Sequence, residues 1–397
     1  MSLSEQRRLA LYLNLGHTLD HLFMLVFPTV VLALGREWQR PYAELLPLSI
    51  GGFIAFGACS IPSGWLADRW SRFGMMVLFF VGIGAASIAT GFAQSDWQIA
   101  LGLTAIGVFA AIYHPVGIAM LVANQSDRLG RTLGVNGVWG NCGVAFAALV
   151  SGALADWLGW RAAFIVPGVL SIAVGAAFYA FGRTLPAPRS AAKPAGAKLP
   201  AAMLARIFVV VAIATSTGGV IFNATTVSMP KLFDERLSAL TDTTLGIGVL
   251  VCIVYLIAAM AQLLVGSLID RYHVKNVFVP VVALQIPLLV AAATTQNLAM
   301  LVIAVAMMFF VFGQIPINDA MIARYTADEW RARAYAVRYV VSFGASATAV
   351  PLIAWVHRSY GDFNPLFMIL AALAAITLAA ALAFPGARAT SAAHAAS

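Results

Sequence analysis

Charged side chains are scarce in this sequence of 397 residues. Asp, Glu, Lys and Arg make up 10% of it, whereas hydrophobic residues make up 61% and the mean hydropathy is +0.88. Soluble domains carry about 25% charged residues, because charge keeps a large surface in contact with water. The shortage therefore excludes a soluble globular protein of this length and predicts that a lipid bilayer surrounds most of the chain.

The sequence also lacks the motifs of nucleotide, metal and catalytic sites. Its three cysteines, Cys59, Cys142 and Cys252, each lie in an apolar run without a CxxC partner, which is typical of helix packing rather than of disulfides or a zinc centre. No GxxxxGK(S/T) segment is present to bind ATP, and no Ser/His/Asp set indicates catalysis. We therefore expect a protein that is not an enzyme, without cofactor or metal.

Long apolar runs are abundant instead. Twelve of them reach the ~20 residues that a helix needs to cross the hydrocarbon core. They are too continuous for the short alternating strands of a membrane β-barrel, so the predicted fold class is an all-α polytopic membrane protein. The predicted spans cover residues 9–34, 43–67, 74–93, 97–123, 132–155, 161–184, 204–228, 244–268, 276–295, 298–323, 333–356 and 363–384.

The few charges are distributed unequally between the two sides of the predicted membrane. Loops on the side of the N-terminus hold 17 of the Lys and Arg residues, and loops on the other side hold 6. Basic residues favour the cytoplasmic side, so we expect an inner-membrane protein with both termini in the cytoplasm. Anionic lipid headgroups then account for the net charge of +8 without a nucleic-acid partner.

The sequence repeats itself at half its length. The segment GWLADR at residues 64–69 returns as GSLIDR at residues 266–271, 202 positions later. Other pairs keep nearly the same spacing: Pro28 with Pro230, Pro115 with Pro316, Arg131 with Arg333, and Gly159 with Gly361. Two parallel repeats of six spans around a central cavity are a transporter architecture.

The repeat divides the chain into four predicted parts. Residues 1–184 form the first six-helix bundle, and residues 204–384 form the second. Residues 185–203 are rich in Pro, Ala and Lys, which is typical of a solvated cytoplasmic linker. The small and polar residues 385–397 are expected to be a disordered tail.

Two short motifs resemble those of the major facilitator superfamily. Residues 64–72 match its loop between spans 2 and 3, residues 266–271 are a degenerate second copy, and Gly159-Trp160-Arg161-x-x-Phe164 matches its corner between spans 5 and 6. The resemblance implies that two bundles rock against each other to give alternating access. It also implies a conformational latch formed by Gly64, Asp68, Arg69, Arg72, Asp270 and Arg271.

The branch within the superfamily is suggested by spans 4 and 5. The motifs Tyr113-His114-Pro115-x-Gly117 and Gly137-x-x-Gly140-Asn141-x-Gly143 resemble the fosmidomycin-resistance type of efflux protein. Residues 147–150 read AALV in place of the Gly-Pro pair of the antiporter motif, which argues against drug/proton antiport. The glycines of span 5 recur every third residue, which predicts close packing against a neighbouring helix.

Polar residues inside the first span form a distinctive group. His17, Asp20 and His21 are spaced i, i+3 and i+4, so they share one face of a helix. A carboxylate that accepts from two imidazoles favours a proton relay, because imidazole titrates near physiological pH. A static hydrogen-bonded cluster is the alternative. A metal shared by the two histidines is less favoured, since no further ligand lies nearby in sequence.

Three other spans carry intramembrane polar residues, which are functional by default. His114 lies beside Pro115 in span 4, and the repeat relates it to Asp319 in span 10, so we expect the two to face each other. Arg338 in span 11 is expected to pair with Asp319, bind an anionic substrate or snorkel to the membrane surface. Further expected contacts are Asn318 beside Asp319 and, in a secondary role, Asn136, Trp139, Asn223 and Gln314.

The sequence thus favours a secondary active transporter. We expect a monomer that moves a small anionic or amphiphilic organic molecule through the membrane, driven by protons, with efflux as the first expectation. Proton-symport uptake of an organic acid is the alternative within transport. A membrane sensor built on the same fold, which does not transport, is the alternative from another class.

Overall fold

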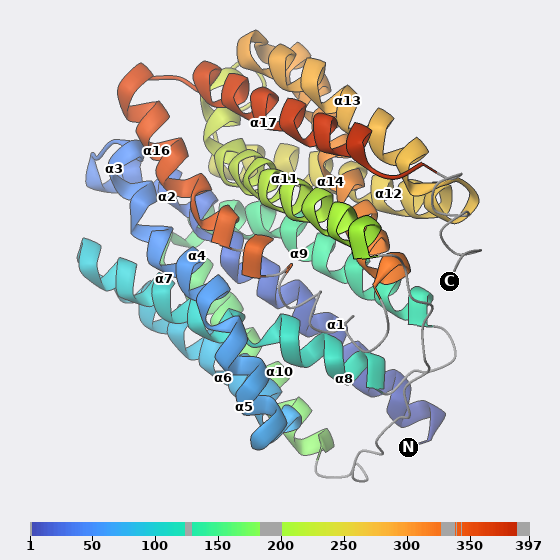
Figure 1. The fold of residues 1–397 in the computed structure, drawn as a ribbon. Helices are drawn as coiled ribbons and strands as arrows, with labels where there is room; N and C mark the ends of the chain where they lie inside the picture. The colour runs from blue at the N-terminus through green and yellow to red at the C-terminus, as the bar shows by residue number, and fades with distance from the viewer. Residues whose placement is uncertain are drawn as a thin grey trace. The chain divides into compact units, whose positions relative to one another are not determined.

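The computed structural model describes residues 2–123, 129–182, 201–326, 338, 340–342 and 344–386. These residues form helices joined by short turns, and no strand occurs among them. The predicted linker at 185–203 and the predicted tail at 385–397 lie almost entirely outside the described residues. Figure 1 shows the course of the chain.

The helices follow the predicted order of spans. The first half contains α1 (Leu3–Leu25), α2 (Phe27–Trp38), α3 (Tyr42–Leu45), η1 (Leu46–Ser49), α4 (Ile50–Ala58), α5 (Ser60–Arg69), α6 (Arg72–Gly91), α7 (Asp96–Ala110), η2 (Tyr113–Gly117), α8 (Ile118–Ala123), α9 (Leu129–Leu158) and α10 (Ala162–Gly182). The second half contains α11 (Ala201–Arg236), α12 (Thr244–Arg271), α13 (Val274–Thr294), α14 (Asn297–Tyr325), α16 (Ala349–Tyr360) and α17 (Asn364–Ala383).

Twelve membrane spans result when bent and broken helices are joined. Eleven described helices are long and apolar enough to cross a bilayer, and the pair Tyr42–Ala58 and Ser60–Arg69, bent by 42°, makes the twelfth. The all-α polytopic prediction is therefore confirmed. Several helices exceed their predicted lengths: α11 has 36 residues, so it is ~54 Å long at 1.5 Å per residue. Hydropathy predicts only the apolar part of α11, because polar residues extend the helix beyond it.

The chain groups into two compact units. One comprises Met1–Ala191 and Val227–Leu256, and the other comprises Ala192–Thr226 and Ile257–Ser397. Polar contacts join Val227–Leu256 to the first unit: Arg36 Nη2 donates to Asp234 Oδ1 at 2.9 Å, and the backbone N–H of Leu245 donates to Asp156 Oδ2 at 2.6 Å. The division into bundles at 184 and 204 stays a prediction.

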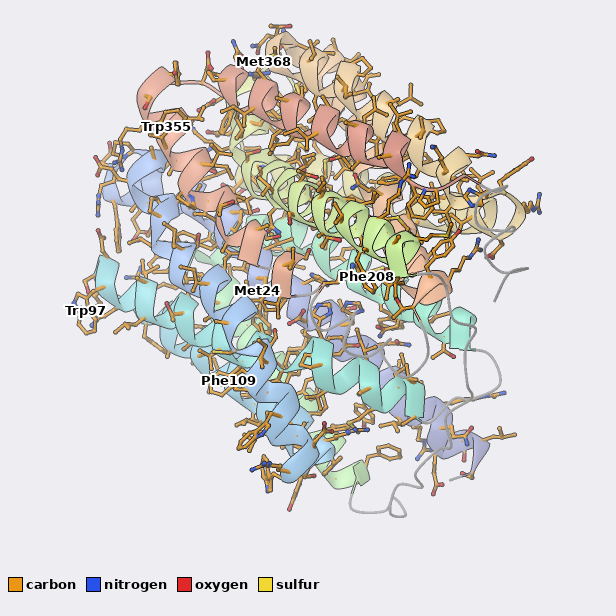
Figure 2. The ribbon with its side chains drawn as sticks, in the orientation of Figure 1. Met24, Trp97, Phe109, Phe208, Trp355 and Met368 are labelled. Atoms are coloured by element: carbon orange, nitrogen blue, oxygen red, sulfur yellow. The ribbon has the colours of Figure 1, made fainter. Side chains whose placement is uncertain are left out.

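Each unit has its own apolar core. In the first unit α6 packs along α10 and α1 packs along α9, and buried rings such as Phe79, Phe80 and Phe178 fill the space. In the second unit α13 packs against α14 and α17. Large apolar side chains also lie outside these cores, including Trp97 and Trp355 (Figure 2), which are 63% and 54% exposed. Lipid is the solvent that such side chains suit.

A left-handed glycine ends the helix at each repeat of the corner motif. Gly159 follows α9 with φ 85°, and Gly361 follows α16 with φ 74°. They are the two glycines with positive φ among the described residues. The internal repeat of the sequence therefore reappears as a repeat of backbone conformation.

We expect Gly159→Ala to destabilise the protein by about 1 kcal/mol, since an L-residue in the left-handed region carries about that penalty. A Cβ at Gly159 meets no atom within 4 Å, so the loss comes from the backbone alone. Gly134→Ala in α9 is the matched control, because it also meets no atom within 4 Å but has helical φ. The apparent midpoint of thermal unfolding in detergent should fall for the first variant only. Equal midpoints for Gly159→Ala and Gly134→Ala would contradict the left-handed conformation of Gly159.

Candidate functional site

A buried polar cluster lies where α1 meets the π-helical turn η2. His17, Asp20 and His21 come from α1, and His114 comes from η2. Pro115 has no N–H to continue the helix, and a widened π-turn replaces regular winding at this point. The turn places His114 Nε2 3.4 Å from Asp20 Oδ2, so residues far apart in sequence share one site.

The imidazoles are oriented by neighbours on α9 and α1. His17 Nδ1 lies 2.8 Å from the backbone oxygen of Asn136. A carbonyl oxygen can only accept, so Nδ1 carries the proton and a neutral His17 has its lone pair on Nε2. That Nε2 lies 3.2 Å from His21 Nε2.

A hydrogen-bond network supports His17 from behind. The Asn136 side chain donates to Asn14 Oδ1 at 2.9 Å and to the Tyr113 hydroxyl at 2.8 Å, and that hydroxyl donates to the Leu13 carbonyl at 2.8 Å. The Tyr113 ring stacks on His17 with centroids 4.8 Å apart. The sequence analysis missed Asn14 and Tyr113, although Asn14 precedes His17 by one helical turn and Tyr113 is the neighbour of His114.

Asp20 differs from its predicted environment. It was expected to accept from His17 or His21, but those two rings contact each other and the α9 backbone instead. Asp20 is fully buried, and its carboxylate oxygens accept no hydrogen bond from the described residues. The imidazole of His114, which was expected to face Asp319, lies 3.4 Å from Asp20 Oδ2 instead. The proton relay stays a prediction.

Glycines of α9 make room for α1. A Cβ on Gly140 would lie 2.6 Å from His17 Cε1, and one on Gly143 would lie 2.2 Å from the carbonyl oxygen of Thr18. The predicted close packing of span 5 is thus present at these two positions, whereas Gly134 has open space. Trp139 lines a shallow apolar pocket of about 200 Å³ together with Thr18, Val138, Cys142 and Phe146.

A second polar site lies in the other unit. Arg338 Nη1 donates to Asp319 Oδ1 of α14, as predicted from the sequence. The Arg338 side chain is 9% exposed and the Asp319 side chain is 41% exposed. Asn318 is buried beside them, and Pro316 lies inside α14 one turn away.

Of the residues given a secondary role, Gln314 joins helices in this unit, whereas the contact of Asn223 lies within α11. Gln314 donates to the Ala214 carbonyl at 3.2 Å and accepts from Gln285 Nε2 at 3.0 Å. The backbone oxygen of Asn223 accepts from Thr226 Oγ1 at 3.2 Å. The expected opposition of His114 and Asp319 stays a prediction, since the two residues belong to different units.

The latch residues form local contacts. Arg72 Nη2 donates to Asp68 Oδ1 at 2.8 Å, Arg69 lies 4.3 Å over the Trp65 ring, and Gly64 packs near Pro115. In the second copy Arg271 ends α12, and Arg324 Nη2 lies 3.3 Å from Asp270 Oδ1. Burial, and then the charges of Arg324 and Lys275, lower the pKa of His273 in the same loop. A latching role for these residues stays a prediction.

Comparison with known proteins places the chain among transporters. MdtG of Dickeya zeae, a multidrug resistance protein, is 23% identical over 335 residues, which cover 81% of this chain and 79% of MdtG. The 4-hydroxybenzoate transporter PcaK of Pseudomonas putida is 29% identical over 35% of this chain and 32% of its own length. The puromycin resistance protein pur8 of Streptomyces alboniger is 30% identical over 27% of this chain, but the alignment spans only 22% of pur8.

The fold agrees with a solved transporter structure. A bacterial homologue of the human lysosomal transporter Spinster superposes with a TM-score of 0.78 at 16% identity, covering 97% of each chain. The Major Facilitator Superfamily matches residues 15–255 and 237–396 of this chain. These ranges contain both copies of the loop motif, and they contain Gly159 and Gly361 at the two corners. The expected resemblance is therefore confirmed, and the chain belongs to the Major Facilitator Superfamily of membrane transporters.

Proposed function

We propose that this protein is a secondary active transporter of a small organic anion, coupled to protons and working by alternating access across the inner membrane. The bias of basic residues supports cytoplasmic termini. The observation that carries the proposal is the ion pair of Asp319, which lies within the span Asn297–Tyr325, with Arg338, which directly precedes the span Val340–Tyr360. An arginine in such a place needs a negative partner, and it binds carboxylates with two parallel hydrogen bonds.

The pair links an anion to a proton. While Asp319 is ionised it occupies Arg338, and an anionic substrate has to displace it. Protonation of Asp319 releases the guanidinium, so the substrate and the proton bind together. Asp319 suits this role better than Asp20, because its side chain is 41% exposed and contacts a guanidinium, whereas Asp20 is fully buried. Movement of the anion with its proton amounts to symport, which is the uptake alternative of the sequence analysis.

A transport assay with a defined anion tests this proposal. We choose 4-hydroxybenzoate, the substrate in the name of the relative PcaK. Purified protein in liposomes should accumulate the labelled anion when the outside is acidic, faster than protein-free liposomes, and a protonophore should abolish the difference. Protein-free liposomes are essential because the neutral acid crosses bilayers by itself.

The variant Asp319→Asn separates coupling from binding. It resembles the protonated state, so exchange of labelled for unlabelled anion should persist while accumulation driven by the pH gradient is lost. Arg338→Ala should lose both activities. Accumulation by Asp319→Asn at the wild-type level would show that Asp319 does not couple transport to protons.

Efflux of an amphiphilic molecule is the second candidate function. Two relatives, MdtG and pur8, are named as resistance proteins, which supports it. Puromycin, named in the relative pur8, is the matching probe. Transport of puromycin without transport of 4-hydroxybenzoate or related carboxylates would favour this second function over the first.

A further inference from the structure

Three imidazoles converge inside the first unit. His17, His21 and His114 each offer one ring nitrogen, and these nitrogens lie within 4.8 Å of one another. Two of them, His17 Nε2 and His21 Nε2, are 3.2 Å apart. In a tetrahedral site with Zn–N bonds of 2.0–2.1 Å, neighbouring ligand nitrogens are about 3.4 Å apart. The two α1 histidines already have this spacing, and rotation of the His114 side chain brings the third nitrogen towards it.

His17 has the second contact that a metal ligand requires. Metal-binding histidines usually donate their other ring N–H to a carbonyl or carboxylate, which fixes the tautomer and the direction of the lone pair. His17 Nδ1–H donates to the Asn136 carbonyl at 2.8 Å, so its lone pair is on Nε2, which lies 3.2 Å from His21 Nε2. Stacking on Tyr113 holds the same ring in place.

A bound cation would stabilise the ionised form of Asp20. A fully buried carboxylate that accepts no hydrogen bond from the described residues is costly in a medium of low dielectric constant. Its Oδ2 lies 3.4 Å from His114 Nε2, at the edge of the three imidazoles. A divalent ion bound by those rings would lie close enough to neutralise Asp20 and to relieve this cost.

The three imidazole nitrogens determine which class of metal ion fits the site. Imidazole nitrogens suit Zn²⁺, Ni²⁺, Co²⁺ and Cu²⁺, whereas Mg²⁺ and Ca²⁺ need sets of oxygen ligands. No thiolate belongs to the cluster in the described part of the chain, which disfavours Cu⁺. We propose that His17, His21 and His114 bind one borderline divalent transition-metal ion beside Asp20.

This proposal does not depend on the proposed transport function, which rests on Asp319 and Arg338. It competes with the proton relay expected from the sequence, because the same residues cannot hold a metal and shuttle protons freely at the same time. The metal is favoured here, since the lone pair of His17 points at a second imidazole and not at Asp20. The opposing outcome is a static hydrogen-bonded cluster that binds no metal ion.

The experiment measures metal binding by the full chain directly. Tag-free protein in detergent is stripped with a chelator, equilibrated with Zn²⁺ and desalted, and its zinc content is measured by mass spectrometry. We expect about one ion per protein, the value for a single mononuclear site. Co²⁺ in place of Zn²⁺ should give the visible absorption bands of a tetrahedral complex.

Variants assign the ion to the cluster. His21→Ala and His114→Ala should each lose the bound zinc, and Gly140→Ala should weaken binding because its Cβ would lie 2.6 Å from His17 Cε1. Asp20→Asn should weaken it by about 10–100-fold, the usual effect of removing an outer partner. The matched control is the double variant His273→Ala and His357→Ala, which removes two imidazoles outside the cluster and should keep one equivalent.

Several results would overturn the proposal. They are wild-type protein without zinc, zinc retained by His114→Ala, or zinc lost from the control variant. X-ray absorption of zinc-loaded wild-type protein provides a measurement that needs no variant, so it remains decisive if a substitution prevents folding. It should show scattering from three imidazole rings, and a single imidazole would point to adventitious binding.

Discussion

Arg338→Ala should weaken the binding of 4-hydroxybenzoate by roughly 100-fold, because two hydrogen bonds to a charged group contribute about 3 kcal/mol. Equilibrium binding of the labelled anion to purified protein in detergent, with competition by unlabelled anion, measures this loss. Arg338→Lys should recover only part of the affinity, since an ammonium keeps the charge but loses the planar pair of donors. Arg358→Ala, at the end of α16 and away from Asp319, is the control and should bind as the wild type does.

The double variant separates two explanations of that loss. Asp319→Ala alone leaves a buried guanidinium without its ionic partner, which destabilises proteins by about 3–5 kcal/mol. Removing Arg338 as well should restore much of the thermal stability but none of the transport. If the double variant instead transports better than Arg338→Ala, the two residues only neutralise each other and the anion binds elsewhere.

Gly143→Ala should also destabilise the protein strongly, by about 3 kcal/mol or more. Its Cβ would lie 2.2 Å from the carbonyl oxygen of Thr18, and backbone atoms on both sides leave no flexible side chain to move. The helices α1 and α9 would have to separate, and the hydrogen bond from Thr18 Oγ1 to the Trp139 carbonyl at 2.7 Å would be lost.

The test for Gly143 is the yield of monodisperse protein after detergent extraction, together with its thermal midpoint. Gly134→Ala in the same helix should match or exceed the wild type, because a Cβ there has open space. A Gly143→Ala protein with the midpoint of the wild type would mean that α1 and α9 do not pack through this glycine.

The spans were predictable because the bilayer imposes a simple rule on sequence. A helix that crosses lipid must be apolar for about 20 residues, so hydropathy finds it without knowledge of its neighbours. Hydropathy cannot show where a helix extends past its apolar part, as α11 does from residue 228 to Arg236. Nor does hydropathy reveal the bend of 42° between Tyr42–Ala58 and Ser60–Arg69. That bend has a local cause, since Pro62 has no N–H to donate to the carbonyl of Ala58.

The candidate site was predictable only as far as one helix extends. The spacing of His17, Asp20 and His21 placed them on one face of α1, since helical periodicity relates near neighbours. Which residues they meet depends on packing between distant segments, and hence His114 and the Asn136 carbonyl could not be assigned from sequence. For Arg338 the sequence left three possibilities open, and the ion pair with Asp319 is one of them, since charge in lipid has few alternatives.

The burial of Asp20 has a consequence for biosynthesis. The ribosome delivers α1 first, carrying two histidines and a carboxylate, and each ionised aspartate at mid-helix opposes insertion by about 2.5–3.5 kcal/mol. The groups that surround this face, His114 and Asn136, belong to spans made later. The nascent first helix therefore presents its polar face to the translocon or to lipid until η2 and α9 emerge. Completion of the first unit shields that face, so folding of this segment is tied to the order of synthesis.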